Sequence, residues 1–199
     1  QMCAQDNMLV AQPSTPASYF HLLREHTYTR PRRPLIVFTP KQLLRLKAAC
    51  SPVEAFTSGT FQPVIGETDD AVLASAQKQG VDRVLLCSGR VYYDLLAHRT
   101  KTGDTRTAIV RLEQLYPLES SAIAEALAPF SGAELVWVQD EPANQGMWPY
   151  LALNLPTDLT GGVLPTLISR PEAAAPAVGT AGLHRAQQEE ILRQAFTRR

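Results

Sequence analysis

Residues 83–112, RVLLCSGRVYYDLLAHRTKTGDTRTAIVRL, decide the fold class. Two of its segments, Arg83–Cys87 and Ala108–Leu112, are short and mostly apolar, as strands inside parallel sheets are. The dipeptide Ser88-Gly89 follows the first of them and leads into a helix expected at about residues 90–99. A strand, a helix and a second strand in this order predict a βαβ unit whose two strands run parallel.

The same alternation continues toward the C-terminus. The further elements that we expect are a helix at about 119–128, a strand at Leu135–Val138, a helix at about 146–154, a strand at Leu164–Ile168 and a helix at His184–Phe196. Only the Ala/Pro-rich segment Pro171–Gly182 reads as a loop or tether. The sequence therefore predicts an α/β fold of three layers, a mostly parallel sheet with helices on both faces.

Toward the N-terminus the sequence indicates the end of another α/β unit. Thr15 and Pro16 are typical N-cap and first-turn residues of a helix, which we expect at about 16–26. One face of that helix carries Tyr19, Leu22, Leu23 and His26. The apolar segment Leu35–Phe38 has the residue types of a strand inside a parallel sheet, and a short helix at about 41–49 follows. Residues 51–80 are expected to be an irregular bridge, with a candidate strand at Phe61–Ile65.

Composition excludes several classes of protein. The chain has 199 residues, of which 45% are hydrophobic and 19% charged, an ordinary globular balance. Its 19 basic and 19 acidic residues give no overall field for nucleic acid, and no apolar run is long enough to span a membrane. The three cysteines suit reduced thiols better than a disulfide framework. The opening residues contain neither an initiator Met nor a signal pattern, so we expect a piece of a longer polypeptide.

Charge is nevertheless distributed unevenly. Residues 1–50 contain seven basic and two acidic residues, a net charge of +5, and the basic excess lies between positions 24 and 47. Such asymmetry is typical of a local anion site or of a surface for an acidic partner. Pairing with acids of another domain explains it equally well.

Motifs of catalysis are absent from the sequence. It contains no phosphate-binding glycine loop, no Cys-x-x-Cys, no His-Glu-x-x-His and no Gly-x-Ser-x-Gly. Gly103-Asp104 is an isolated pair in a polar turn, and the four histidines have no metal-site spacing. We expect His21 and His26 to be partly exposed or at the edge of the core. The chain is therefore not expected to contain a catalytic apparatus of its own.

Three features allow a functional and a structural interpretation. Ser88-Gly89-Arg90 either holds an anion at a helix start or supplies an N-cap serine and a tight turn, and we favour the second. Gln139–Pro142 follows a strand and brings paired acids for acid–base chemistry, although a solvated turn or subunit contact is the favoured reading. Three aromatic side chains form either an interface cluster or part of the core: Trp137, Trp148 and Tyr150.

Several longer motifs, taken in order, closely resemble one family. They are Asp6-Asn7-Met8, Pro13–Ala17, Arg33–Lys41, Leu86–Leu95, Asp140–Gly146 and the closing segment from Ser169 to His184. Over essentially all 199 residues the chain resembles the C-terminal end of the E1 component of 2-oxoglutarate dehydrogenase. The resemblance implies a transketolase-like architecture. In it, residues 1–50 end the pyrimidine-binding domain, 51–80 form a linker, and 81–199 form a C-terminal domain like that of transketolase.

The resemblance also implies the chemistry of the whole enzyme. Members of the family use thiamine diphosphate and Mg²⁺ to decarboxylate 2-oxoglutarate, and they pass a succinyl group to the lipoyl arm of E2, dihydrolipoyl succinyltransferase. The residues for cofactor, metal and catalysis would precede this chain, so no catalytic residue is assigned here and the isolated chain is expected to be inactive. The implied partners are a second E1 subunit, E2 and the rest of the E1 chain, with no nucleic acid and no membrane. The implied location is a bacterial cytoplasm, or the mitochondrial matrix in a eukaryote.

An effector site is implied as well. The resemblance implies an allosteric pocket for acetyl-CoA or AMP at the junction of the pyrimidine-binding and C-terminal domains. There Arg33 would bind phosphate, assisted by Arg24 and Lys41. A structural ion pair at Arg33 is the alternative, and Glu25 stands where some members have a second basic residue. Two rival functions remain open: an E1 that acts on 2-oxoadipate, and a free-standing α/β module that binds a partner without catalysis.

Overall fold

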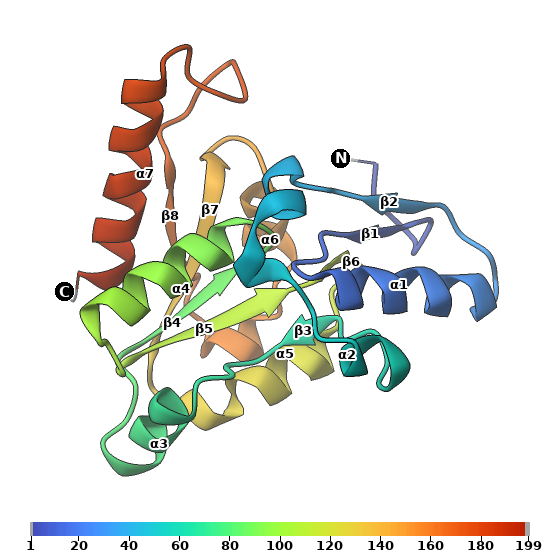
Figure 1. Cartoon of the computed structure of the whole chain (residues 1–199), viewed down its shortest axis with the longest axis horizontal. Helices are drawn as coiled ribbons and strands as arrows, with labels where there is room; N and C mark the ends of the chain where they lie inside the picture. The colour runs from blue at the N-terminus through green and yellow to red at the C-terminus, as the bar shows by residue number, and fades with distance from the viewer. Residues whose placement is uncertain (1, 198–199) are drawn as a thin grey trace.

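The computed structural model describes residues 2–197, which form two β-sheets with helices packed around them (Figure 1). The strands are β1 (Leu9–Ala11), β2 (Leu35–Val37), β3 (Val64–Ile65), β4 (Arg83–Cys87), β5 (Thr107–Leu112), β6 (Gln114–Tyr116), β7 (Glu134–Pro142) and β8 (Thr166–Arg170). The α-helices are α1 (Pro16–Tyr28), α2 (Glu54–Thr57), α3 (Asp70–Lys78), α4 (Val91–Thr102), α5 (Ser120–Leu127), α6 (Trp148–Asn154) and α7 (Ala181–Phe196). Four 3₁₀ turns complete the set: η1 (Lys41–Arg45), η2 (Lys47–Ala49), η3 (Ala128–Phe130) and η4 (Thr157–Thr160).

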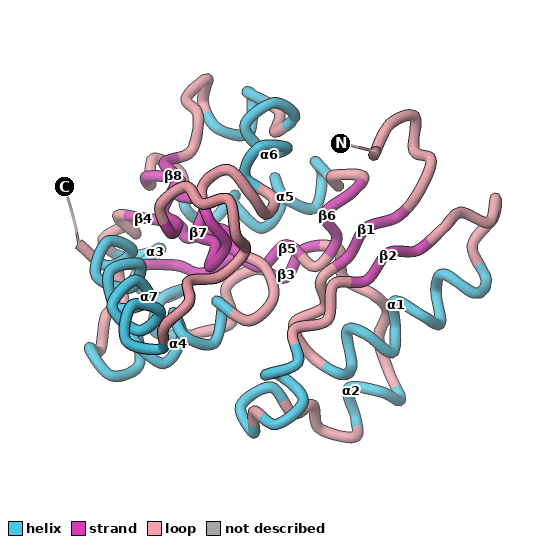
Figure 2. Tube along the Cα trace, turned by 90° about the horizontal axis from the view of Figure 1, so that it is seen from above, coloured by secondary structure: helices cyan, strands magenta, loops and turns pink. Residues whose placement is uncertain are grey.

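The larger sheet has the strand order β3-β5-β4-β7-β8. Strand β4 pairs in parallel with β5 and β7, β7 pairs in parallel with β8, and β3 runs antiparallel to β5 at one edge. Helices α4 and α7 cover one face, and α3, α5 and α6 cover the other, as Figure 2 shows from above. The expected α/β architecture, mostly parallel and covered on both faces, is confirmed.

Strand β4 lies at the centre of this sheet, and its burial explains its sequence. All five of its residues are buried. Leu85 and Cys87 pack toward α4 and α7, whereas Val84 and Leu86 pack toward the opposite layer. Because both faces are covered, the strand needs apolar side chains at successive positions instead of alternating ones.

The smaller sheet, of order β2-β1-β6, carries α1 on one face. Strands β1 and β2 are parallel, and Ala11, Leu22 and Phe61 form the buried centre between sheet and helix. The Thr15 side chain accepts a hydrogen bond from the Ser18 N–H at 3.1 Å, so the predicted N-cap is confirmed. Strand β2 was expected inside a sheet, but it lies at the edge, with Ile36 44% exposed.

The prediction that residues 51–80 form an irregular bridge is wrong for much of that segment. It contains α2, β3 and α3, and Val72 of α3 is fully buried in the core of the larger sheet. The Asp69 side chain caps α3 by accepting from the Ala71 N–H at 2.9 Å. The expected strand Phe61–Ile65 is shorter, because Phe61 packs instead beside Leu22 in the smaller unit. Small residues and short elements made the apolar periodicity of this segment weak.

Other differences concern the ends of elements. The helix expected at 41–49 is two 3₁₀ turns separated at Leu46, which has an extended backbone. Strand β6 was not foreseen, because it follows β5 after the single residue Glu113 and yet belongs to the other sheet. Helix α7 begins at Ala181, where the Thr180 side chain accepts from the Leu183 N–H, so the predicted loop ends two residues earlier. No described helix is long and apolar enough to cross a membrane.

Candidate functional site

Arg33 lies in the loop between α1 and β2, where it lines a small pocket. The pocket has a volume of about 130 Å³ and is lined by Leu9, His26, Thr29, Arg30, Pro31 and Arg33. Within residues 2–197, no carboxylate forms an ion pair with the half-buried Arg33. Its neighbour Arg30 donates from Nη1 to the backbone oxygen of Thr29 at 2.9 Å. This volume suits a phosphate-sized anion, since whole small molecules need roughly 300–1,000 Å³.

The other two basic residues of the expected effector site lie elsewhere. Arg24 is exposed on α1 and Lys41 is exposed at the start of η1, and neither lines this pocket. The structure instead brings Arg33 together with Arg30 and His26. Arg30 is one of the basic residues concentrated between positions 24 and 47, so its place in the sequence near Arg33 could have suggested that the two lie together. His26 had no such signal, because only the course of the chain after α1 places it there.

The carboxyl ends of β4 and β7 meet at the point where the sheet order reverses. From this point the chain passes from β4 to β5 on one side and from β7 to β8 on the other, which makes it the usual ligand position of open α/β sheets. Arg90 donates there to Asp140 Oδ2 from Nε at 3.0 Å and Nη2 at 2.8 Å, and from Nη1 to Asp94 Oδ2 at 2.6 Å. Burial lowers the pKa of Arg90, but the two carboxylates outweigh burial and raise the pKa above its ordinary value. The guanidinium therefore neutralises acids of its own chain.

The turn after β4 is covered by a side chain from the smaller unit. Ser88 Oγ donates to Gln12 Oε1 at 2.6 Å, and a Cβ on Gly89 would lie 2.6 Å from Gln12 Nε2. Gly89 has φ of +62°, so the tight turn requires glycine for two reasons. Helix α4 starts only after Arg90 and has no side-chain cap, so the prediction of Ser88 as N-cap is wrong. Gln12 occupies the place where an anion would approach this turn.

The loop that follows β7 is organised by a buried amide. Gln139 Oε1 accepts from Trp137 Nε1 at 2.8 Å and from the Trp148 N–H at 3.1 Å, and Gln139 Nε2 donates to the Gln145 backbone oxygen at 2.8 Å. Trp137 is 1% exposed and Trp148 is partly buried against the same core. This arrangement favours the core interpretation of the aromatic cluster. The paired acids also have structural surroundings: Asp140 is ion-paired, while burial and the adjacent Asp140 raise the pKa of Glu141 above its ordinary value.

Another hollow lies at the opposite edge of the sheet. It has a volume of about 600 Å³ and is lined by Asp82, Arg83, Gly132, Ala133, Glu134, Leu135, Thr160, Val163, Leu164, Pro165 and Thr166. Its charged groups are engaged: Arg83 pairs with Glu134 at 2.6 Å, and Asp82 pairs with Arg106. No sequence motif points to this hollow, and its ion pairs leave it without an evident catalytic group.

Metal-ligating side chains are not clustered among the described residues. Within residues 2–197 no group of three or more His, Cys, Asp or Glu side chains could hold a metal ion. Gly103 ends α4 in a left-handed conformation, with φ of +67°. Asp104 then accepts from the Arg106 N–H at 2.7 Å and from Thr107 Oγ1 at 3.2 Å. The Gly103-Asp104 pair is therefore a structural turn, as its polar surroundings in the sequence predicted.

The cysteines and His21 are the remaining side chains considered in the sequence. All three cysteines are free thiols, and burial raises the pKa of Cys87 to about 12, so this thiol stays protonated at neutral pH. His21 is buried on α1, and its Nε2 lies 2.8 Å from the backbone oxygen of Ala55. His21 is thus a residue at the edge of the core, one of the two positions expected for it.

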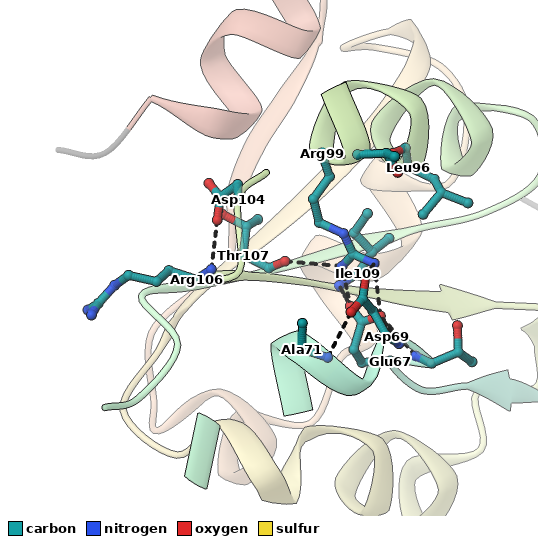
Figure 3. A network of polar contacts seen from close by, with 11 residues as sticks. Glu67, Asp69, Ala71, Leu96, Arg99, Asp104, Arg106, Thr107 and Ile109 are labelled. Atoms are coloured by element: carbon teal, nitrogen blue, oxygen red, sulfur yellow. Dashed lines mark hydrogen bonds and ion pairs between the residues drawn. The ribbon is translucent and has the colours of Figure 1, made fainter. Parts of the chain in front are cut away.

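A buried ion pair that sequence analysis missed organises the segment before α3. Figure 3 shows Arg99 of α4 facing Glu67, with Nη1 to Oε2 at 2.5 Å and Nη2 to Oε1 at 3.0 Å. Their side chains are 3% and 2% exposed. The Glu67 carboxylate also accepts the N–H groups of Thr68, Asp69 and Ile109, each at 2.8 Å. No motif signals this pair, because its partners are 32 residues apart and meet only when α4 crosses the sheet.

Comparison with known proteins gives one consistent family. Residues 50–196 match a family model described as 2-oxoglutarate dehydrogenase C-terminal. The 2-oxoglutarate dehydrogenase E1/E2 component of Corynebacterium glutamicum is 44% identical over 98% of this chain and 16% of its own length. The E1 components of Haemophilus influenzae and Cupriavidus necator are 41% and 43% identical over 99% and 100% of this chain.

These relatives are much longer than the chain. It spans 21% of the Haemophilus influenzae protein and 20% of the Cupriavidus necator protein. The match to a C-terminal family model confirms the resemblance seen in the sequence motifs. The chain therefore belongs to the 2-oxoglutarate dehydrogenase E1 family, and it corresponds to the C-terminal part of its members.

Proposed function

We propose that this chain is the C-terminal portion of the E1 subunit of a 2-oxoglutarate dehydrogenase complex and that it supplies structure instead of catalytic groups. The whole enzyme would decarboxylate 2-oxoglutarate oxidatively, a step of the tricarboxylic acid cycle, and transfer succinyl to lipoyl-E2. One observation carries the structural role: at the carboxyl edge of the larger sheet, Arg90 pairs with Asp94 and Asp140, and Gln12 covers the adjacent turn. The protein's own side chains fill the place of a ligand.

The division into domains follows from the same family. We assign residues 1–50 to the end of a pyrimidine-binding domain and 81–199 to a C-terminal domain like that of transketolase. Large apolar side chains exposed in the first unit support this assignment: Phe20, Leu23, Ile36 and Phe38 are 42–53% exposed. Such a surface is expected where the rest of a larger domain packs. Strand β3 pairs with β5 of the larger sheet, and α3 packs on that sheet. We therefore place residues 64–78 with the C-terminal domain and not in a linker.

The cofactors and partners are proposed for the whole enzyme and not for this chain alone. Thiamine diphosphate, with Mg²⁺, would supply the group that stabilises the carbanion after decarboxylation. Residues outside this chain would bind both, since the carboxylates described above are engaged in turns and ion pairs. A second E1 subunit, E2 and the remainder of E1 are the proposed partners. A bacterial cytoplasm is the proposed location, by analogy with the bacterial relatives, and the mitochondrial matrix would replace it in a eukaryote.

The pocket at Arg33 is the part of the chain to which we assign a regulatory role. We propose that Arg33 contributes to a site for the phosphate of acetyl-CoA or AMP. Its pocket is lined by residues 9–33 of the smaller unit and not by the junction with residues 81–199, where the family resemblance implied the site. The support is that Arg33 has no carboxylate partner within the described residues, while Arg30 and His26 line the same pocket. The small volume implies that the remainder of the nucleotide would contact other parts of the enzyme. Arg24 and Lys41 would act only at long range.

Three measurements test this proposal. The natural protein that contains this sequence should be several times heavier than the 21.9 kDa of the chain, and it should consume 2-oxoglutarate faster than 2-oxoadipate. A mass near 21.9 kDa would support a free-standing binding module instead, and a preference for 2-oxoadipate would change the substrate. The 199-residue chain alone, supplied with thiamine diphosphate and Mg²⁺, should show no turnover above a buffer blank. Clear turnover would refute the purely structural role.

A further inference from the structure

Glu113 lies where the chain passes from one sheet to the other. It is the single residue between β5 of the larger sheet and β6 of the smaller, and it is fully buried. Its Oε2 atom accepts the Ser14 N–H at 2.7 Å and the Ser18 hydroxyl at 2.6 Å. Both donors belong to the start of α1 in the smaller unit. A buried carboxylate of one unit thus holds the first turn of a helix in the other.

Side chains of the larger unit hold Ser14 at its remaining polar atoms. Arg111 Nη1 donates to Ser14 Oγ at 3.0 Å, and the Tyr93 hydroxyl donates to the Ser14 backbone oxygen at 2.7 Å. The Arg111 guanidinium also lies 4.1 Å from the centre of the Tyr92 ring. Together with Glu113, these residues bind the N–H, the carbonyl and the hydroxyl of one serine. All of these bonds join Ser14 of the smaller unit to side chains of the larger one.

We propose that Glu113 is a latch that fixes α1, and with it the smaller unit, to the larger sheet. Its position at the start of a 13-residue helix favours a negative charge, because the first N–H groups of a helix carry a partial positive charge. The latch acts on the position of α1 through bonds within the chain, so Glu113 is proposed as a positioning residue. This inference concerns contacts within the chain and does not depend on the proposed enzymatic role.

Burial makes the charged form of the latch costly, in opposition to the helix start. Burial raises the pKa of Glu113 above its ordinary value, and the hydrogen bonds from Ser14 and Ser18 and the charge of Arg111 oppose this only in part. Its Oε1 atom and the Nε of Arg111 have no hydrogen-bond partner within the described residues. A folded-state pKa above the unfolded value means that the latch stabilises the fold most at low pH. Its contribution falls as the pH rises from the unfolded value through the folded one.

Other groups near the carboxyl come from each element packed against it. Arg111 is on β5, Tyr93 on α4 and Cys87 on β4, and Arg111 is the charged one near neutral pH. His21 lies on α1 one turn beyond Ser18, with its Nε2 engaged by Ala55. The substitution Glu113→Gln separates charge from bonding, because the amide oxygen can accept both bonds from α1 without titrating.

The test is hydrogen exchange by mass spectrometry on the whole natural protein that contains this chain. In Glu113→Ala, peptides from 14–28 should exchange about tenfold faster than in the wild type, because buried donors lose their acceptor. Peptides from 83–87 and 107–112 should stay protected. Ser18→Ala should show a smaller increase in the same segment, and the control Glu125→Ala, at an exposed position of α5, should show none. The Glu113→Gln variant should keep α1 protected at neutral pH.

Three results would overturn the latch. The first is wild-type exchange of 14–28 in Glu113→Ala, and the second is an equal loss of protection in 83–87 and 107–112. If Glu113→Ala does not fold, Ser18→Ala decides the matter, and unchanged exchange in that variant refutes the proposal. The pH dependence has its own test: opening of α1 in the wild type should increase relative to Glu113→Gln as the pH rises. A ratio that stays constant with pH would refute the titrating latch.

Discussion

The buried pair Glu67–Arg99 should be among the costliest interactions of this fold to break. The side chains are 2% and 3% exposed, so the substitution Arg99→Met would leave a carboxylate in the core without its cation. Removing one partner of such a pair costs about 3–5 kcal/mol. Glu67 keeps three backbone N–H donors, from Thr68, Asp69 and Ile109, so the lower end of that range, about 3 kcal/mol, applies. For a chain of this size the melting temperature should fall by about 6–12 °C.

The matched control is the exposed pair Arg193–Glu190. Those side chains are 62% and 46% exposed, so Arg193→Met should lower the stability far less than Arg99→Met does. Urea unfolding followed by the fluorescence of the two tryptophans, Trp137 and Trp148, measures both variants, since both pack in the core of the larger sheet. The double change Glu67→Leu with Arg99→Met should recover part of the loss, because no buried carboxylate then lacks its cation. Asp69, which also pairs with Arg99 at 3.5 Å, is 43% exposed and can be solvated by water. Equal losses in Arg99→Met and Arg193→Met would refute the argument.

Three further predictions concern separate parts of the chain. In the whole enzyme, Arg33→Ala should lower the activation by acetyl-CoA or AMP, and an unchanged activation curve would remove Arg33 from the effector site. Iodoacetamide at pH 8 should modify the exposed Cys50 in the folded chain and leave Cys87 unmodified, because burial raises the Cys87 pKa to about 12. Mass spectrometry of the peptides measures both sites, and labelling of Cys87 as early as Cys50 would contradict this prediction. Gly146→Ala should destabilise the chain by about 1–2 kcal/mol, since φ is +69° and a Cβ would lie 3.0 Å from Gln139; denaturation midpoints equal to wild type would contradict this.

The central strands were predictable because a strand buried on both faces needs apolar side chains at successive positions. Strand β4 is apolar at four consecutive positions, from Val84 to Cys87, and no competing pattern explains that run. The capping pair Thr15-Pro16 was predictable for a similar reason, since the bond from Thr15 to Ser18 is local. Helix α3 was missed because its burial rests chiefly on Val72 and small neighbours, which give little periodicity.

The candidate site was predictable only in part. Arg33 came from a motif and from charge, and its pocket with Arg30 and His26 required the path of the loop after α1. Whether Ser88 and Arg90 bind an anion depends on which side chains they contact, and those contacts cannot be predicted from sequence spacing. Gln12 is 76 residues from Ser88, and Asp140 is 50 residues from Arg90. A side chain's freedom to bind a ligand depends on such partners, and so it is a tertiary property.

The sequence by itself determined the α/β class, the parallel core, the absence of catalytic motifs and the family, because each of these rests on residue type and local order. Only the tertiary structure decided which polar groups meet: Arg90 with Asp140, Arg99 with Glu67, and Glu113 with the start of α1. The physical reason is that burial of a charge is tolerated only beside a compensating partner. That partner can come from anywhere in the chain, so its position in sequence carries no signal until the sheets are assembled.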